Sequence, residues 1–164
     1  MYIRDIWEKF EALDGVNNNL RGSVFELLIG SIFLVNGIQP LYRQAEVTYV
    51  NNARFDYLLW ENALRPISIS VKTSLRERYK QADLEAWALK SVHKGAENYL
   101  VTLSQGEIAT RQRKIENGTE FSSLDSMYLA TDPKFDGFVA YLKGLDFGSP
   151  QNVNPMASKY VAKV

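Results

Sequence analysis

The sequence predicts one α/β domain built on a mixed central sheet of about five strands flanked by helices. Three observations lead to this prediction. The 164 residues have the length of a single domain. Segments with helical spacing of apolar residues alternate with short β-rich segments, in the order two helices, three strands, helix, strand, helix, strand, helix. No repeat or linker divides the chain, so we expect one domain over residues 1–164.

Residues 1–40 are expected to form a helical N-terminal part. Apolar residues recur at three- and four-residue spacing from Ile3 to Leu13, and Asp14-Gly15 is a typical helix end. A second helix is expected over about residues 21–36, because Asn36-Gly37 is again a typical end. This second segment is apolar on most sides, which predicts that it is largely buried.

Residues 41–131 are expected to form the main part of the domain, which holds all of the predicted strands. The predicted strands cover residues 42–50, 54–60, 66–73, 98–103 and 126–130, and the predicted helices around them cover 79–94, 107–117 and 133–145. Asn51-Asn52 and Glu61-Asn62 are turn-forming pairs, so at least the first two strands should form a meander. Residues 148–164, which begin with a stretch rich in Gly, Pro and Asn, are expected to be a loose tail.

The composition argues against several classes of function. No stretch approaches the ~20 apolar residues that span a bilayer, and the N-terminus lacks the charged start and apolar core of a signal peptide. The absence of cysteine excludes a thiolate metal site, and a single histidine, His93, argues against His-ligated zinc and a Ser-His-Asp triad. These features favour a soluble, cytoplasmic protein. The 19 basic and 19 acidic residues give zero net charge, which by itself argues against a nucleic-acid partner.

Four charged residues lie where solvation alone does not explain them. Asp56 lies in the middle of a predicted strand, where aspartate is rare. Lys72 ends the third predicted strand on the same face as Ser70. Glu85 lies on the next helix, thirteen residues after Lys72, and Glu26 lies within the apolar second helix. Oxygen ligands of this kind suit a hard cation such as Mg²⁺, and a lysine beside them can orient water and stabilise phosphate charge.

Three of these residues also have a simpler interpretation. Asp56 would instead pair with a neighbouring arginine, Arg43 or Arg54, on an edge strand. Glu26 would occupy the polar side of its helix, and Lys72 would be an ordinary lysine at the end of a strand. Considered singly or in pairs, the four residues therefore do not decide between a structural and a catalytic role.

The triplet Arg76-Glu77-Arg78 lies between the third strand and the following helix. Arginine can bond guanine O6 and N7 together and glutamate can accept from cytosine N4, so the triplet is suited to reading adjacent G·C pairs. A solvated charge cluster is the simpler interpretation, but arginines at a helix N-terminus oppose the helix dipole. Contacts to phosphates are a further alternative. From Arg65 to Lys80 there are five basic residues and one acidic residue, so zero net charge does not exclude DNA.

The run Ser70-x-Lys72-x3-Arg76-Glu77-Arg78, followed by Glu85, resembles type II restriction endonucleases of the PD-(D/E)xK superfamily. It is most similar to the branch that reads CCGG, CCNGG and CCWGG sites. In that branch, serine often replaces the acid two residues before the lysine, and a carboxylate on the following helix takes over its role. Ser70 and Glu85 fit this relocation, although Asp83 competes with Glu85 and differs from it only in spacing.

The resemblance covers about residues 22–85 and extends to two more acids. Asp56 fits the strand aspartate, although Phe55 stands where the superfamily name has proline. Glu26 fits the acid commonly found on an N-terminal helix. The resemblance therefore implies a single restriction-endonuclease-like domain, with residues 41–131 as its catalytic core.

The resemblance also implies Mg²⁺-dependent hydrolysis of double-stranded DNA at a C·G-containing site as part of a restriction-modification system. Mn²⁺ is expected to substitute for Mg²⁺, and no nucleotide cofactor or membrane is implied. Asp56 and Glu85 would ligate the metal with the backbone carbonyl of Val71. Lys72 would orient the attacking water, and Glu26 would support this site or hold a second metal. The residues implied to read bases are Arg76, Glu77 and Arg78, and their implied neighbours at the DNA are Ser70, Tyr79, Lys80 and Gln81.

A palindromic site needs two half-site readers, so a homodimer is expected. The alternative is a monomer that nicks one strand at a time. Three further alternatives concern function: a noncatalytic DNA-binding protein of the same fold, a structure-selective enzyme such as a repair nuclease or junction resolvase, and a protein-interaction domain that uses the charged helix with Arg111, Arg113 and Lys114. The joint presence of Asp56, Lys72 and Glu85 argues against the first, and the Arg-Glu-Arg triplet argues against the second.

Overall fold

The computed structural model describes residues 2–62, 64–76, 78–150 and 157–161. It confirms the prediction of a mixed α/β domain: helices flank a mixed sheet whose described strands number six, in the order β5-β4-β3-β2-β1-β6. The helices are α1 (Tyr2–Glu11), α2 (Asn18–Val35), α3 (Arg78–Val92), α4 (Gln105–Glu116) and α5 (Pro133–Lys143). The strands are β1 (Leu41–Glu46), β2 (Phe55–Asn62), β3 (Arg65–Lys72), β4 (Glu97–Thr102), β5 (Ser126–Leu129) and β6 (Ala157–Val161).

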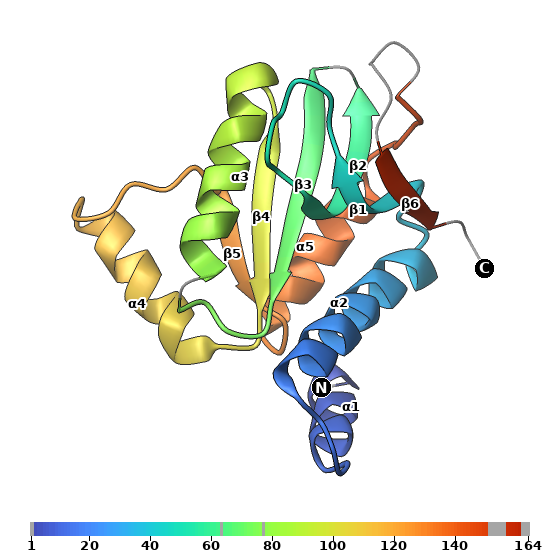
Figure 1. Ribbon diagram of the computed structural model, residues 1–164, viewed down its shortest axis with the longest axis vertical. Helices are drawn as coiled ribbons and strands as arrows, with labels where there is room; N and C mark the ends of the chain where they lie inside the picture. The colour runs from blue at the N-terminus through green and yellow to red at the C-terminus, as the bar shows by residue number, and fades with distance from the viewer. Residues whose placement is uncertain (1, 63, 77, 151–156, 162–164) are drawn as a thin grey trace.

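The sheet combines a meander with two crossover connections (Figure 1). Strands β1, β2 and β3 are antiparallel neighbours, and no described helix lies between them in the chain. Strand β4 runs parallel to β3, and β5 runs parallel to β4, so each of these pairs is joined through a helix, α3 and α4 respectively. The antiparallel register pairs Tyr57 with Ile69, which brings the start of β2 to the end of β3.

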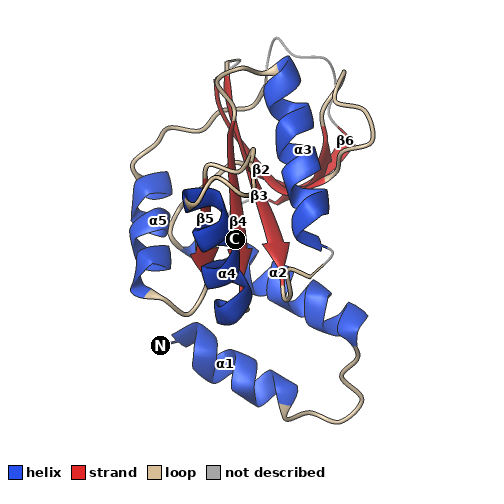
Figure 2. Ribbon diagram, turned by 90° about the vertical axis from the view of Figure 1, so that its left-hand side faces the viewer, coloured by secondary structure: helices blue, strands red, loops and turns tan. Residues whose placement is uncertain are grey.

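Helices cover both faces of the sheet (Figure 2). On one face, Phe25, Ile29 and Phe33 of α2 and Phe135 and Phe138 of α5 form the largest apolar cluster with the buried side chains of β2, β3 and β4. Helices α3 and α4 cover the other face, where a smaller cluster forms around Leu100 of β4 and Met127 of β5. The alternation of side chains along β3 separates the two faces and leaves Ser68, Ser70 and Lys72 on the side of α3.

Helix α2 is capped at its start and fitted closely to the sheet. Asn17 precedes the helix, and its side chain accepts a hydrogen bond from the Leu20 N–H at 2.9 Å. Gly30 lies against β2, where a Cβ atom would come within 2.2 Å of the Tyr57 hydroxyl oxygen. That hydroxyl donates a hydrogen bond of 2.7 Å to the Glu26 carbonyl. The glycine therefore lets α2 approach β2 closely enough to bring Glu26 to the sheet.

Strand β1 is shorter than the predicted 42–50, because it ends at Glu46. Residues 47–54 instead form a loop over the face of the sheet that carries α3, with Val47, Val50 and Ala53 buried against Leu58 and Trp60 of β2. These three apolar residues are spaced by three, which suits a packed loop better than the alternation of a strand. Tyr49 and Asn52 in this loop have left-handed backbones, with φ of 68° and 59°.

The C-terminal segment that was expected to be loose contributes an edge strand. Strand β6 pairs antiparallel with β1, with Tyr160 opposite Tyr42. The rest of the predicted tail beyond residue 150 lies outside the described residues. In the part of the chain that the structure describes, no helix has the length and apolar character needed to cross a membrane.

Candidate active site

An ion pair between Asp56 and Lys72 lies where the start of β2 meets the end of β3. Lys72 Nζ lies 2.6 Å from Asp56 Oδ2, and the same oxygen accepts a hydrogen bond of 2.7 Å from the Val71 N–H. The Asp56 and Lys72 side chains are only 12% and 9% exposed. Antiparallel pairing places these residues together although sixteen positions separate them in sequence. Removing one partner of such a pair would leave an uncompensated buried charge, which typically costs about 3–5 kcal/mol.

The simpler interpretation of Asp56, an edge-strand acid paired with arginine, is wrong. Strand β2 lies inside the sheet, between β1 and β3. Arg43 pairs instead with Glu26, at 2.6 Å between Nε and Oε1. Arg54 forms an exposed ion pair with Glu46. Asp56 therefore takes its positive partner from Lys72.

Glu85 lies on the inner face of α3 and is only 6% exposed. Burial raises the pKa of its carboxyl group, and the negative charge of Asp56 acts in the same direction. The hydrogen bond from Gln81 Nε2 to Glu85 Oε1, at 2.9 Å, and the positive charge of Lys72 oppose this rise without cancelling it. The charges of Asp56 and Lys72 both act on Glu85, so the three side chains lie within electrostatic range of one another.

Asp83, the competing helix acid, has a different environment. Its Oδ1 accepts hydrogen bonds from the Ser123 N–H at 2.6 Å and from the Ser122 hydroxyl at 3.0 Å. These contacts attach α3 to the segment before β5. The geometry thus favours Glu85 over Asp83 as the acid that belongs with Asp56.

Gln44, which no sequence pattern marks as a site residue, links Glu26 to Asp56. Gln44 Nε2 donates to Glu26 Oε1 at 3.1 Å and to Asp56 Oδ1 at 3.3 Å. Arg43 Nε donates to the same Glu26 oxygen at 2.6 Å. Glu26 is therefore not a solvated helix residue: two side chains of β1 hold it. Nothing in the sequence around Gln44 distinguishes it from an ordinary polar strand residue.

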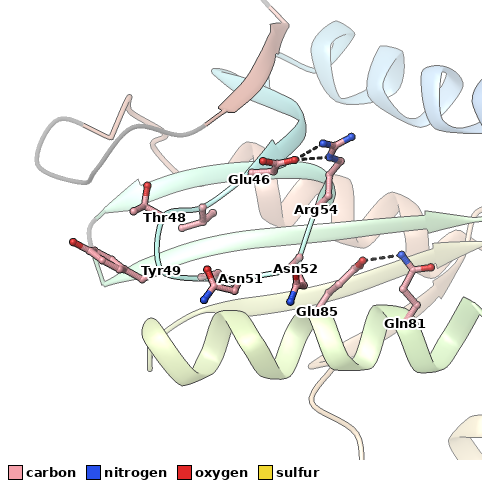
Figure 3. A pocket seen from close by; sticks show the side chains of 11 residues that line it. Glu46, Thr48, Tyr49, Asn51, Asn52, Arg54, Gln81 and Glu85 are labelled. Carbon is pink, nitrogen blue, oxygen red and sulfur yellow. Dashed lines mark hydrogen bonds and ion pairs between the residues drawn. The ribbon is translucent and has the colours of Figure 1, made fainter.

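A cavity of about 540 Å³ adjoins Glu85 (Figure 3). Glu85 and Gln81 line it from α3, and residues 46–54 line it from the facing loop. Most of the polar side chains of this loop wall are uncharged: Thr48, Tyr49, Asn51 and Asn52. Its volume lies within the range of about 300–1,000 Å³ typical of ligand pockets, so there is room for a ligand beside Glu85.

The segment after β3 is held by α4. Glu107, in the first turn of α4, accepts a hydrogen bond from the Leu75 N–H at 2.8 Å and another from the Ser74 hydroxyl at 3.3 Å. Its partial burial acts to raise the pKa of Glu107, but these hydrogen bonds, together with others, outweigh it and lower the pKa. Arg76 and Arg78 lie at the surface. Glu77, the third member of the triplet, lies outside the described residues.

The expectation that Ser70 and Tyr79 lie at the DNA is wrong, because both side chains are buried. Ser70 is 3% exposed and Tyr79 is 1% exposed, so neither offers a surface to DNA. Tyr79 packs in the cluster under α3, with the Arg111 guanidinium 4.6 Å from the centre of its ring. Lys80 and Gln81, the other two neighbours, are exposed. Arg111 also forms an ion pair with Glu120 at 2.7 Å. Its charge is therefore partly neutralised within the protein, and Arg111 is not simply part of an exposed charged face of α4.

The oxygen donors of the site suit a magnesium ion whose coordination is completed by water and substrate. They suit a metal ion whose ligands all come from the protein less well. Among the described residues, no group of three or more His, Cys, Asp or Glu side chains is arranged to hold a metal ion. Mg²⁺, however, is commonly bound through one or two carboxylates, with water and substrate phosphate completing its coordination. Asp56 and Glu85 are two carboxylates, the number that such a site uses, and the Val71 N–H donates a hydrogen bond to Asp56.

Comparison with known proteins adds no assignment: no family model, no curated protein and no solved structure matches the chain.

Proposed function

We propose that the protein is a Mg²⁺-dependent endonuclease of the PD-(D/E)xK type that cuts double-stranded DNA at a C·G-containing site. The site would be of the CCGG or CCNGG kind, and the enzyme would act in the cytoplasm as part of a restriction-modification system. The observation that carries the proposal is the buried Asp56–Lys72 pair beside the buried Glu85. A metal-binding acid, a lysine and a second acid in one place are the groups that phosphodiester hydrolysis uses.

The energetics of burial support a functional role for these three residues. Replacing a buried ion pair by apolar residues of similar volume is often neutral or stabilising, so stability alone does not require Asp56 and Lys72. Ionising Glu85 in the folded protein costs further free energy, because its carboxylate is buried; the raised pKa of Glu85 reflects this cost. A buried acid with a perturbed pKa that lines a cavity, as Glu85 does, is typical of functional sites.

In the proposed reaction, Asp56 and Glu85 would hold the metal together with the Val71 carbonyl. When bound, Mg²⁺ supplies positive charge for the phosphate and makes a water molecule more acidic. Lys72 is held by Asp56, and an ammonium group has three N–H donors. One contacts Asp56, and the others serve to orient the attacking water and to stabilise the charge that develops on the phosphate oxygens.

Recognition is assigned to the segment between β3 and α3. Arg76 and Arg78 are exposed within a few residues of Lys72, so side chains that read bases would lie beside the group that acts on the phosphate. The proposed partner is double-stranded DNA, bound by two copies of the chain, one at each half-site. A noncatalytic DNA-binding protein would keep the exposed arginines but would have no use for the buried Asp56, Lys72 and Glu85.

Replacement of Lys72 by alanine tests the catalytic assignment. We expect Lys72→Ala to lower the cleavage rate by at least about 100-fold, since it removes a group that stabilises transition-state charge. Specific DNA binding should remain near the wild-type level in a gel-shift assay. Asp56→Asn, which keeps the shape of the side chain, should show the same loss and serves if Lys72→Ala folds poorly.

Lys90 provides the matched control for this substitution. It also forms a lysine–aspartate ion pair, with Asp125 at 2.8 Å, but on the outside of α3 and half-exposed. Lys90→Ala should cleave like the wild type. Cleavage by Lys72→Ala at the wild-type rate would show that the active site has been assigned to the wrong residues.

A further inference from the structure

Gln44 has a backbone conformation that its residue type does not favour. It lies inside β1 with φ of 53°, in the left-handed region. For a residue with a Cβ atom this region costs roughly 1–2 kcal/mol, and glycine would occupy it without that cost. The pairing of β1 with β6 shifts its register between Arg43 and Glu46, around this residue. An irregularity of this kind inside a strand commonly redirects a side chain.

The redirected side chain lies between two carboxylates from different elements. Its Nε2 atom is 3.1 Å from Glu26 Oε1 on α2 and 3.3 Å from Asp56 Oδ1 on β2. A primary amide has two N–H donors, so one Gln44 side chain satisfies both acids. The other Asp56 oxygen, Oδ2, is held by Lys72 and by the Val71 N–H. Both oxygens of Asp56 are thus oriented by neighbouring strands.

We infer that Gln44 is a positioning residue of the proposed metal site, which fixes the Asp56 carboxylate and couples it to Glu26. This inference rests on the proposed function. It adds that the contacts of Gln44 with Asp56 and Glu26 contribute to the affinity of the site for a divalent cation. From this backbone the long amide side chain reaches both acids. Outer partners that orient a metal-binding carboxylate typically change metal affinity or activity by 10–100-fold when they are removed.

Gln44→Gly tests the role of the side chain in metal binding separately from its role in folding. Glycine adopts the left-handed backbone freely, and this gain offsets part of the loss of the two hydrogen bonds, so the metal-free variant should remain folded, with a melting temperature at or moderately below that of the wild type. Mn²⁺ affinity, measured by titration calorimetry on the full-length protein without DNA, should fall by about 10–100-fold. Gln44→Asn keeps an amide and tolerates this backbone but is one methylene too short to reach both acids, so it should show the same loss.

Gln112→Ala is the control. It also removes an amide side chain, but from an exposed position on α4 outside the site, and it should bind Mn²⁺ as the wild type does. Wild-type Mn²⁺ affinity in both Gln44 variants would overturn the inference and leave the proposed function intact. An equal loss in Gln112→Ala would also overturn it, because the effect would then not depend on the position of Gln44. No Mn²⁺ binding by the wild type would instead contradict the proposed metal site, and the role of Gln44 with it.

Discussion

Asp56, Lys72 and Glu85 are buried ionisable side chains within electrostatic range of one another, and Glu85 lines a cavity. The sequence indicated all three, because an acid inside a strand, a lysine at a strand end and an acid at a set distance on the next helix form a readable pattern. Gln44 carries no such signal. Its importance depends on a backbone dihedral and on two contacts across the structure, neither of which can be read from neighbouring residues.

Glu85→Gln should stabilise the metal-free protein at neutral pH while removing cleavage. Because burial raises the pKa of Glu85, the native state binds a proton more tightly than the unfolded chain, and ionisation at higher pH destabilises the fold. Glutamine avoids that penalty. The gain in melting temperature should be present at pH 7 and vanish below about pH 4, where the carboxyl group is neutral in both states.

The pH dependence distinguishes this cause from better packing. A gain of the same size at pH 7 and at pH 3.5 would mean that the amide packs better and that ionisation of Glu85 is not penalised. A loss of stability at pH 7 would contradict the burial argument outright.

Arg76→Ala tests whether the exposed arginines read bases. A bidentate contact to guanine is worth roughly 1–3 kcal/mol of discrimination, so the ratio of cognate to random DNA affinity should fall by about 5- to 150-fold. Binding to random DNA should change far less, as fluorescence anisotropy with the two duplexes would show. Equal losses on both duplexes would reassign Arg76 to the phosphate backbone.

At the scale of secondary structure, the helices follow the predicted spans more closely than the β1 region does. Helical periodicity is local, so α1 to α5 follow from spacing and from end signals such as Asn36-Gly37. The loop after Glu46 was predicted as strand because Val47 and Val50 are β-formers, but their burial comes from packing on β2. Strand β6 depends on pairing with β1, more than a hundred residues away, which no local pattern reports.

Glu107→Gln should loosen the attachment of the recognition segment to α4. The hydrogen bonds from Leu75 and Ser74, with others, outweigh partial burial and lower the pKa of Glu107, so its ionised form stabilises the fold above the ordinary carboxyl pKa. The variant should lose no more than about 1 kcal/mol at pH 7, since solvent screens a partly exposed group. That difference should shrink as the pH falls below about 4.

The control for this prediction is Glu116→Gln, which changes an exposed residue at the other end of α4. It should leave the free energy of unfolding within about 0.5 kcal/mol of the wild type. Urea unfolding of the three proteins at pH 7 and pH 3.5 provides the comparison. A pH-independent loss in Glu107→Gln would mean that its charge plays no part in holding Leu75 and Ser74.

At the scale of the whole molecule, zero net charge conceals a basic segment from Arg65 to Lys80 beside the candidate active site. A neutral chain gains little from bulk attraction to DNA, so affinity should depend mainly on base contacts and on the divalent cation. The mixed α/β fold followed from the order of the elements, whereas the convergence of Asp56, Lys72, Glu85 and Glu26 required the sheet register and the close approach of α2.

A palindromic target predicts a homodimer. Light scattering on the protein without DNA should give about twice 18.7 kDa, because both half-sites must be read together. A mass of one chain, combined with nicked rather than linear plasmid as the first product, would contradict the dimer and favour a monomer that cuts one strand at a time.

Sequencing the ends of DNA cut by the protein is the most direct test of its proposed activity. Phage-sized DNA would be incubated with the wild type and with Lys72→Ala, each with and without Mg²⁺. We predict discrete fragments that share a C·G-rich terminal sequence with 5′-phosphate and 3′-hydroxyl ends, produced only by the wild type with Mg²⁺. Intact DNA or an unspecific smear across divalent metals, or the same fragments from Lys72→Ala, would contradict a sequence-specific nuclease built on Asp56, Lys72 and Glu85.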